Sequence, residues 1–340
     1  MKILFFTISG RNGASSRYRV YQYLPILETA GFHVKVMPPL FPGRRGLMRW
    51  IHGIMEKAAC LRAAREADVL FIQKRLFGEG FIRRLTALGK RTVFDFDDSV
   101  FTSPRADWTA LTRSRTQARI NGVLRGVDQV IAGNGFLRAF AETSGAKRVE
   151  VLPTPIDTSR YPVKMQYVHG PPTVGWIGSA VNHRYVDLLS RVLPPLSEEF
   201  HGLKLLMVSN ETYAMPGVAV ENRRWSEETE ARDIHDMDVG LMPLVDNEWT
   251  RGKCALKALQ YMACGVPAVC SPVGANLEVI DDGKEGFLPR TDGEWLECLR
   301  RLLQSSELRG NLGREGRKKV EANYSLNAIG LKLIELLQSL

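Results

Sequence analysis

No run of apolar residues in this sequence is long enough for a membrane-spanning helix, which needs about 20 of them. Low-complexity tracts are also missing. No Gly-x-Gly-x-x-Gly motif follows the first predicted strand, so a nicotinamide-dependent oxidoreductase is not expected. Cysteine is scarce, and the cysteines lack the spacing of paired metal ligands, which predicts reduced, buried thiols in a cytoplasmic protein. They are Cys60, Cys254, Cys264, Cys270 and Cys298.

Strand-like apolar runs alternate with helical segments along the chain, which predicts an α/β fold with doubly wound parallel sheets. The chain has 340 residues, of which 44% are hydrophobic, and this is enough for two cores. The strands predicted for the first half are residues 3–8, 33–37, 69–73, 92–96, 129–132 and 149–152. In the second half, residues 173–179 form an opening strand and loop, and strands follow at 204–209, 218–220, 239–243 and 268–271.

The alternation of strands and helices restarts at Thr173, which indicates a second domain. Residues 154–157 and 160–162 contain prolines and are expected to form a hinge strand and a linker. We therefore predict two Rossmann-like domains, residues 1–154 and 155–324. Two such sheets facing each other would place an active site in the cleft between them.

A basic helix edge precedes the Gly265-Val266-Pro267 turn. Residues 254–264 carry apolar side chains at helical spacing, which predicts a helix that buries one stripe. Its other edge carries Lys253, Lys257 and Gln260, and Gly252 lets the chain approach a ligand where the helix begins. Backbone N–H groups at a helix start favour an anion, and the two lysines add charge for a diphosphate. The alternative is a solvated helix edge that binds nothing.

Three ordered segments of the second half, residues 238–244, 252–267 and 271–278, resemble glycosyltransferase family 4. These are retaining nucleotide-sugar transferases with the GT-B fold, so the resemblance implies two Rossmann-like domains facing across a cleft, with residues 325–340 packing back on the first. Gly252 and Gln260 replace the usual Glu-x7-Glu pair of the family. In this respect the chain resembles one branch of the family. An amide still bonds a ribose hydroxyl, whereas glycine offers only its backbone.

The same resemblance implies which residues bind the donor. Arg184 and Lys257 would neutralise the leaving diphosphate; Arg184 stands near the position of a family lysine, and Trp176 takes the place of the family arginine. Glu278 matches a glutamate near the nucleotide and could equally cap a helix. The predicted donor-binding residues are Gly178, Ser179, Lys253, Gln260, Gly274, Ala275, Asn276 and Glu278.

The segment Asp95-Phe96-Asp97-Asp98 ends a predicted strand. In transferases of another fold an Asp-x-Asp pair holds a divalent metal, but here lysines supply positive charge, so neither an essential metal nor a cofactor is predicted. Family 4 members often place a His-Asp pair beside the sugar, and Asp97 and Asp98 match those positions. Asp97 is expected to accept a sugar hydroxyl or to stabilise positive charge at the anomeric carbon. A cap formed by Asp98 with Ser99 is the competing interpretation for that residue.

The loop 10–13 follows the first strand and precedes an amphipathic helix. Its glycines allow a tight turn, and its amides are suited to a phosphate or an acceptor. In the enzymes that the chain resembles, this loop borders the donor and acceptor sites, so Gly13 and Arg17 are the candidates. A purely structural turn is an equal alternative for Gly10.

The formal net charge is +9. One short segment combines many basic and apolar residues, a profile typical of a helix that lies on an anionic membrane surface. An ordinary surface helix of the first domain is the alternative, and nucleic acid is not expected because no recognition motif accompanies the charge. The basic residues are Arg44, Arg45, Arg49, Lys57, Arg62 and Arg65, and the apolar ones are Leu47, Met48, Trp50, Ile51, Ile54 and Met55.

These features predict a retaining, metal-independent glycosyltransferase. It would move a sugar from a nucleotide-diphosphate sugar to a glycan, a lipid-linked acceptor or another cell-envelope acceptor, in the cytoplasm or peripherally on the inner face of the membrane. The missing first glutamate favours a rival, a catalytically silent nucleotide-binding or assembly subunit of the same fold. A nucleotide-sugar epimerase would keep both carboxylates, and Gly252 and Gln260 argue against it.

Overall fold

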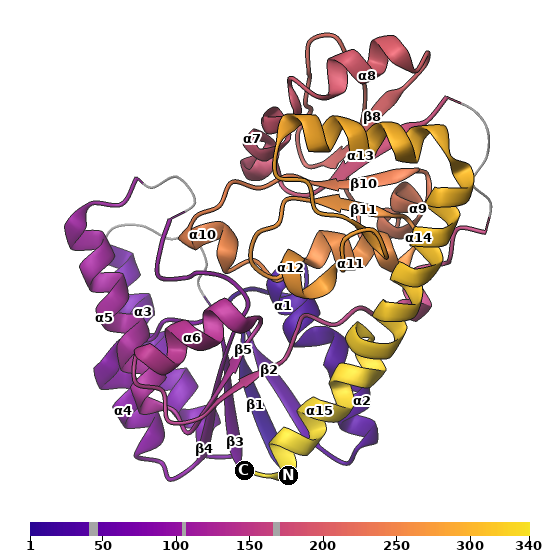
Figure 1. Ribbon diagram of the computed structural model, residues 1–340. Coiled ribbons are helices and arrows are strands. Elements are labelled where there is room, and N and C mark those ends of the chain that lie inside the picture. The colour runs from indigo at the N-terminus through magenta and orange to yellow at the C-terminus, as the bar shows by residue number, and fades with distance from the viewer. Residues whose placement is uncertain (41–46, 104–106, 166–170) are drawn as a thin grey trace. The chain divides into compact units, whose positions relative to one another are not determined.

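The computed structural model describes residues 1–40, 47–103, 107–165 and 171–340, with the backbone alone for 47–50. The chain divides into two compact units. Unit 1 comprises Met1–Pro155, Arg251–Cys254 and Ile329–Leu340, and unit 2 comprises Ile156–Thr250 and Ala255–Ala328. Each unit contains a parallel sheet with flanking helices (Figure 1), which confirms the predicted α/β fold class. Unlike the predicted domains, unit 1 includes a short segment from the middle of the second half.

Unit 1 contains, among the described residues, a six-stranded sheet with the order β2-β1-β3-β4-β5-β6. All neighbours are parallel; for example, Ile3 pairs with Val69 across β1 and β3. β3 is buried along its whole length, as expected for a strand covered on both faces. The strands are β1 (Lys2–Phe6), β2 (His33–Met37), β3 (Val69–Gln73), β4 (Arg91–Phe96), β5 (Gln129–Ala132) and β6 (Val149–Val151).

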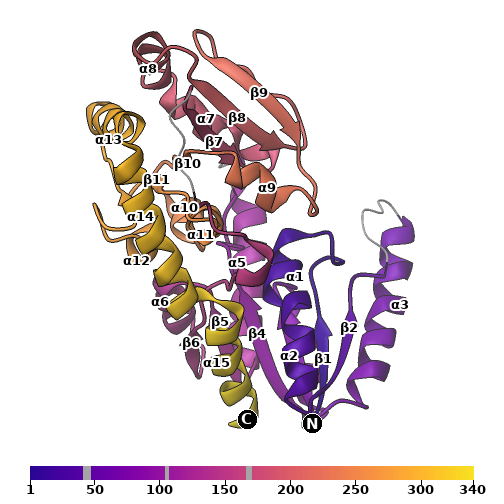
Figure 2. The same ribbon diagram turned by 90° about the vertical axis from the view of Figure 1, so that its right-hand side faces the viewer.

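Four helices of unit 1, α3 to α6, share one hydrophobic core with one face of the sheet, to which Leu4, Leu70 and Phe94 belong. On another side, α15 lies beside α2, because Gly330 leaves room for Ile26: an added Cβ would come 2.2 Å from Ile26 Cδ1 (Figure 2). The helices are α1 (Ala14–Arg19), α2 (Leu24–Thr29), α3 (Leu47–Ala64), α4 (Glu79–Thr86), α5 (Ala110–Gly126), α6 (Gly135–Thr143) and α15 (Leu326–Gln338).

Unit 2 repeats the architecture with the strand order β12-β11-β10-β7-β8-β9, again six parallel strands in the described residues. The strands are β7 (Thr173–Ile177), β8 (Lys204–Ser209), β9 (Ala219–Arg224), β10 (Val239–Met242), β11 (Ala268–Cys270) and β12 (Gly286–Phe287). The helices are α7 (His183–Val186), α8 (Leu193–Glu199), α9 (Glu230–His235), α10 (Glu248–Arg251), α11 (Leu256–Ala263), α12 (Asn276–Val279), α13 (Asp292–Gln304) and α14 (Ser306–Lys319), the last continued by a π turn (Val320–Tyr324).

Two strands of unit 2, β9 and β12, differ from the prediction by more than one residue. β9 extends to Arg224, although its last residues, from Glu221 on, are polar or charged; β9 lies at an edge of the sheet, where such residues are tolerated. β12 was not predicted, because two residues are too short a run to show a periodicity.

Each sheet has one point where the strand order reverses direction. In unit 1 this point lies between β1 and β3, and in unit 2 it lies between β7 and β10. Ligands of open α/β sheets bind outside the carboxyl ends of the strands at such switch points. The fold therefore directs attention to the loops after these four strands.

The basic amphipathic segment lies partly outside the described residues. Arg44 and Arg45 are not described, nor are the side chains of Leu47, Met48, Arg49 and Trp50. The described part of α3 exposes Ile51, Ile54 and Met55, each by at least 41%. No helix in the described ranges combines the length and apolar character needed to cross a bilayer. All five cysteines lie in described segments, and none forms a disulfide.

Candidate functional site

The loops after β1, β3 and β4 converge at the switch point of unit 1. Ser15, in the first turn of α1, donates its hydroxyl to both carboxylate oxygens of Asp97, at 2.7 and 2.8 Å. Lys74, directly after β3, places its Nζ 3.0 Å from Asp97 Oδ1 and also pairs with Asp98. Asp97 is only 13% exposed. The predicted catalytic carboxylate thus lies in a polar cluster built from three loops.

Burial alone would raise the pKa of Asp97, but Lys74, Arg19 and the Ser15 hydroxyl outweigh it and lower the pKa below the ordinary carboxyl value. For Lys74 the effects are opposite. Burial alone would lower its pKa, but the Asp97 and Asp98 carboxylates outweigh this effect and raise the pKa. Asp97 is therefore a carboxylate and Lys74 an ammonium over the whole physiological range. The site offers a fixed negative charge at the carboxyl edge of the sheet.

The aspartates of the Asp-x-Asp segment have different partners. Asp95 is buried and pairs with Arg19, which also donates to the Leu152 carbonyl at 2.7 Å. Burial raises the pKa of Asp95, and the Arg19 charge partly offsets this effect. Asp97 and Asp98 instead face Lys74. Within the described residues, no three His, Cys, Asp or Glu side chains cluster as metal ligands.

The predicted helix start at Gly252-Lys253 is wrong. α11 begins at Leu256, after Ala255 adopts a left-handed backbone (φ 52°), and Arg251–Cys254 belongs to unit 1. Gly252 packs so closely on Ser99 that an added Cβ would lie 2.0 Å from the Ser99 Oγ. Glycine is required there because the segment follows the surface of unit 1.

The segment Arg251–Cys254 is held by unit 1 through several contacts. The Asn134 amide donates to the carbonyls of Arg251 and Lys253 at 3.1 and 3.0 Å, while its oxygen caps α6. The Cys254 thiol donates to the Asp97 carbonyl at 3.2 Å. Burial lowers the pKa of Lys253, and the nearby Asp98 carboxylate partly offsets this. The structure thus places Lys253 near Asp97 and Asp98 and before the start of α11.

Gly13 directly precedes α1, and Arg17 lies in its last turn. Gly13 packs against Ser9, where an added Cβ would come 1.9 Å from the Ser9 Oγ. Arg17 is 5% exposed, and its guanidinium lies 4.7 Å from the centre of the Tyr18 ring. Both residues therefore have structural contacts, and a contact with phosphate or acceptor stays a prediction.

In unit 2, Lys257 and Gly178 meet at the switch point between β7 and β10. Lys257 lies in the first turn of α11, and its Nζ lies 5.2 Å from the centre of the Trp176 ring. Gly178 gives the lysine room, since an added Cβ would be 2.8 Å from Lys257 Cε. No side chain of the described residues caps the start of α11. A cation and a helix N-terminus thus occupy the same corner of the sheet, which suits an anion.

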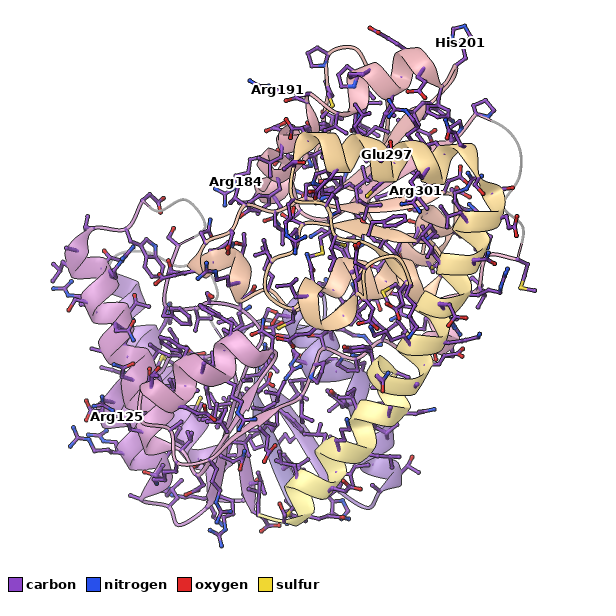
Figure 3. All side chains as sticks on the ribbon, in the orientation of Figure 1. Arg125, Arg184, Arg191, His201, Glu297 and Arg301 are labelled. Atoms are coloured by element: carbon purple, nitrogen blue, oxygen red, sulfur yellow. The ribbon has the colours of Figure 1, made fainter. Side chains whose placement is uncertain are left out.

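The loop after β7 carries two further predicted residues. Ser179 is exposed and precedes a short turn, in which the Ala180 amide donates to Asn210 Oδ1 at 2.9 Å. Arg184 extends from α7 (Figure 3) and donates to the Tyr185 hydroxyl at 3.0 Å, with its guanidinium 4.9 Å from the Tyr185 ring centre. Arg184 is half-buried. A role of these side chains at the diphosphate stays a prediction.

Gln260 lies inside unit 2 rather than at its surface. It is 4% exposed, and its amide donates to the Tyr161 hydroxyl at 3.3 Å. Tyr161 in turn donates to Glu230 at 2.6 Å, and Glu230 also accepts from the Trp225 indole at 2.8 Å. The residue at the second glutamate position therefore takes part in a buried network that ties α11 to the linker and α9.

The predicted residues after β11 form a tight turn. Gly274 has a left-handed backbone (φ 56°), which allows the Leu277 amide to donate to the Gly274 carbonyl at 3.1 Å. Ala275 and Asn276 are buried, and the Asn276 amide donates to the Ser271 carbonyl at 2.9 Å. Glu278 is exposed. Of the four predicted residues, Glu278 is thus the exposed one.

Sequence reasoning missed Lys74, Ser15 and Asn134 as site residues. Lys74 and Ser15 follow predicted strands of unit 1, so the rule that polar residues gather at carboxyl strand ends could have identified them. Asn134 caps α6 in the same position after β5. Its second role, holding Arg251–Cys254, depends on a contact over more than 100 residues.

Comparison with known proteins relates part of the chain to glycosyltransferases. Residues 171–305, all within unit 2, match the family described as glycosyl transferases group 1. A D-inositol 3-phosphate glycosyltransferase of Corynebacterium urealyticum is 27% identical over 231 residues, 66% of this chain. Spore coat protein SA of Bacillus subtilis is 32% identical over 80 residues, 23% of this chain. The matched part of the chain spans about half the length of the Corynebacterium protein and about a fifth of the length of the Bacillus protein.

Solved structures resemble the chain over its full length. A sucrose-phosphate synthase from Thermosynechococcus elongatus has a TM-score of 0.77 at 15% identity, covering 100% of this chain and 98% of the other. Anabaena HepE in complex with UDP and glucose has a TM-score of 0.70 at 16% identity and full coverage of both chains. The chain thus has the GT-B fold, and its residues 171–305 match the family described as glycosyl transferases group 1.

Proposed function

We propose that the protein is a retaining, metal-independent glycosyltransferase that uses a nucleotide-diphosphate sugar. The observation that carries the proposal is Lys257, which lies in the first turn of α11 and over Trp176, at the switch point of the domain that matches glycosyl transferases group 1. The structural relative HepE binds UDP and glucose according to its description, which supports a nucleotide-sugar donor.

In this proposal unit 2 binds the donor diphosphate. Charge grows on the leaving diphosphate as the glycosidic bond breaks, and preorganised donors stabilise that charge more than the ground state. Lys257 and the N-terminus of α11 supply the fixed positive charge, with Arg184 and the Ser179 loop as further donors. Gly274 and Glu278 would border the nucleotide.

Asp97 supplies the negative charge that transfer needs at the anomeric carbon. Its lowered pKa keeps it ionised, and its Ser15 and Lys74 contacts fix its orientation. The acceptor hydroxyl attacks from the face of the leaving group, and the leaving phosphate takes its proton, so configuration is retained. This route requires no second carboxylate of the kind that glycosidases use.

Nucleotide binding tests the donor assignment. We expect one nucleoside diphosphate, from a panel of uridine, guanosine, adenosine and thymidine diphosphates and their sugars, to raise the unfolding temperature, because a ligand of the folded state stabilises it. The shift should persist in EDTA, since lysine and the α11 N-terminus replace a metal. Differential scanning fluorimetry measures the shift, and NMR of the product measures the anomeric configuration.

Each outcome of this panel separates two interpretations. A shift without turnover of the donor would favour the silent nucleotide-binding or assembly subunit, which the glycine at position 252 still supports. A shift that EDTA abolishes would contradict metal independence. If no ligand of the panel raises the unfolding temperature, the assignment of the donor site to unit 2 is contradicted.

The acceptor side of the proposal includes a glycan or lipid-linked acceptor at an anionic membrane surface. α3 exposes Ile51, Ile54 and Met55. Arg62, near the end of α3, and Arg65, in the turn directly after it, are also exposed. Apolar residues followed by basic ones suit the boundary between acyl chains and anionic headgroups. The protein would then be peripheral on the inner face of the membrane.

Vesicle binding checks the membrane assignment. We expect the protein to sediment with vesicles of phosphatidylcholine and phosphatidylglycerol but not with phosphatidylcholine alone. The double variant Arg62→Glu and Arg65→Glu should lower the partition coefficient at least about tenfold, because each basic residue near the surface contributes about 1 kcal/mol. Exposed arginines of unit 2 provide the matched control, Arg191→Glu with Arg290→Glu. Equal loss in both double variants would contradict a specific α3 surface.

A further inference from the structure

Lys74 has an unusual backbone conformation. Its φ of 59° lies in the left-handed region, which only one other non-glycine residue among those described, Ala255, adopts. Lysine has no intrinsic preference for this region, so the surrounding structure must enforce it. The amide of Lys74 donates to the Asp95 carbonyl at 2.8 Å, which fixes the turn directly after β3. Strain of this kind at the carboxyl edge of a sheet calls for a functional explanation.

The left-handed turn directs the Lys74 side chain onto the Asp97 loop. Its Nζ contacts Asp97 Oδ1 at 3.0 Å and pairs with Asp98. Ser15 holds both oxygens of the same carboxylate from α1. An ionised carboxylate has about four acceptor positions, so Asp97 keeps capacity for a substrate hydroxyl while its orientation is fixed from two elements.

Other charged groups surround Asp97. Arg19 pairs with Asp95 and the Leu152 carbonyl, and Lys253 interacts electrostatically with both Asp98 and Asp97. Lys74 contacts the Asp97 carboxylate directly. The titratable and charged groups facing Asp97 are Lys74 after β3, Arg19 on α1, Asp95 and Asp98 on the β4 side, and Lys253 and Cys254 of the segment Arg251–Cys254.

We propose that Lys74 is a positioning residue of the transfer reaction, which orients Asp97 and keeps it ionised toward the sugar. The inference rests on the proposed function, because it assigns Lys74 a role through the carboxylate that acts there. Lys74 does not bind the donor diphosphate, whose site lies in unit 2. Loss of Lys74 therefore affects the chemical step and its pH dependence, and leaves the binding of the donor unchanged.

The test is the pH profile of transfer by the full chain, with the nucleotide sugar that the panel selects. In Lys74→Met, kcat at neutral pH should fall about 10- to 100-fold, since small misplacements of a catalytic group have effects of this size. The acid limb should move upward by about one to three pH units, because an adjacent cation lowers a carboxyl pKa by that amount. The KM for the donor should stay within about twofold. Lys74→Arg should return the acid limb toward its original position.

Lys164→Met is the matched control, since Lys164 is equally buried and pairs with Asp238 at 3.2 Å in unit 2. Its acid limb should stay in place. If Lys74→Met does not fold, Lys74→Gln removes the charge and keeps hydrogen-bonding capacity. Two outcomes would contradict the positioning role and leave the proposed function intact. In the first, the neutral variants are active and their acid limb does not move. In the second, their KM for the donor rises while kcat is unchanged. A wild-type protein that transfers no sugar contradicts the proposed function, and the inference falls with it.

Discussion

Replacing Asp97 with Asn should lower kcat by about 100- to 1,000-fold and leave nucleotide binding intact. Asparagine has nearly the same shape but no charge, so in the proposed mechanism the variant loses the electrostatic stabilisation of positive charge at the anomeric carbon, and losses of this kind have that magnitude. Donor binding should persist because the proposed nucleotide site is in unit 2. Steady-state kinetics give kcat, and thermal shift with the nucleoside diphosphate gives binding.

The pH profile adds a second criterion for Asp97. Its pKa is lowered, so the carboxylate is ionised above that pKa and activity is lost only as the pH falls through it. In Asp97→Asn this acid limb should disappear. Asp128→Asn is the control, because Asp128 accepts from the Thr92 amide at 2.9 Å at the amino ends of the strands, the opposite edge of the same sheet. A kcat within about threefold of wild type in Asp97→Asn would remove Asp97 from the mechanism.

The sequence predicted the strands of unit 1 well because their signal is local. β3 and β5 have the predicted bounds, since each is a short apolar run between polar turns. The restart of the pattern at Thr173 also marks β7 correctly. β12 and the polar end of β9 depend on tertiary pairing and have no comparable signal.

The candidate site depends more on contacts that are distant in sequence. The periodicity of residues 254–264 suggested a helix from Gly252 onward, but the contacts of Asn134 and Ser99 hold Arg251–Cys254 on unit 1 and delay the helix to Leu256. Gln260 lies on the helix as predicted. Its hydrogen-bond partner Tyr161 could not be predicted, because it lies 99 residues away in the sequence. Helical spacing predicts which face a residue occupies, not what faces it.

Lys257→Met should abolish the thermal shift given by the nucleoside diphosphate and lower kcat/KM for the donor at least about 100-fold. The lysine supplies the positive charge next to the α11 N-terminus, and an ammonium that meets the leaving phosphate stabilises both the bound donor and the transition state. Methionine keeps the apolar stem that packs over Gly178 and Trp176, so the fold should persist. Isothermal titration with the nucleotide and steady-state kinetics measure the two effects.

Lys204→Met provides the control for this variant, because Lys204 is also in unit 2, is paired with Glu221 at 3.0 Å and is exposed at the amino end of β8. Its nucleotide affinity and kcat/KM should equal those of wild type. Comparison with Asp97→Asn then assigns the two charges: Lys257 should affect KM and kcat together, whereas Asp97 should affect kcat alone. If Lys257→Met binds the diphosphate as tightly as wild type, the anion site lies elsewhere and the cation over Trp176 has a structural function.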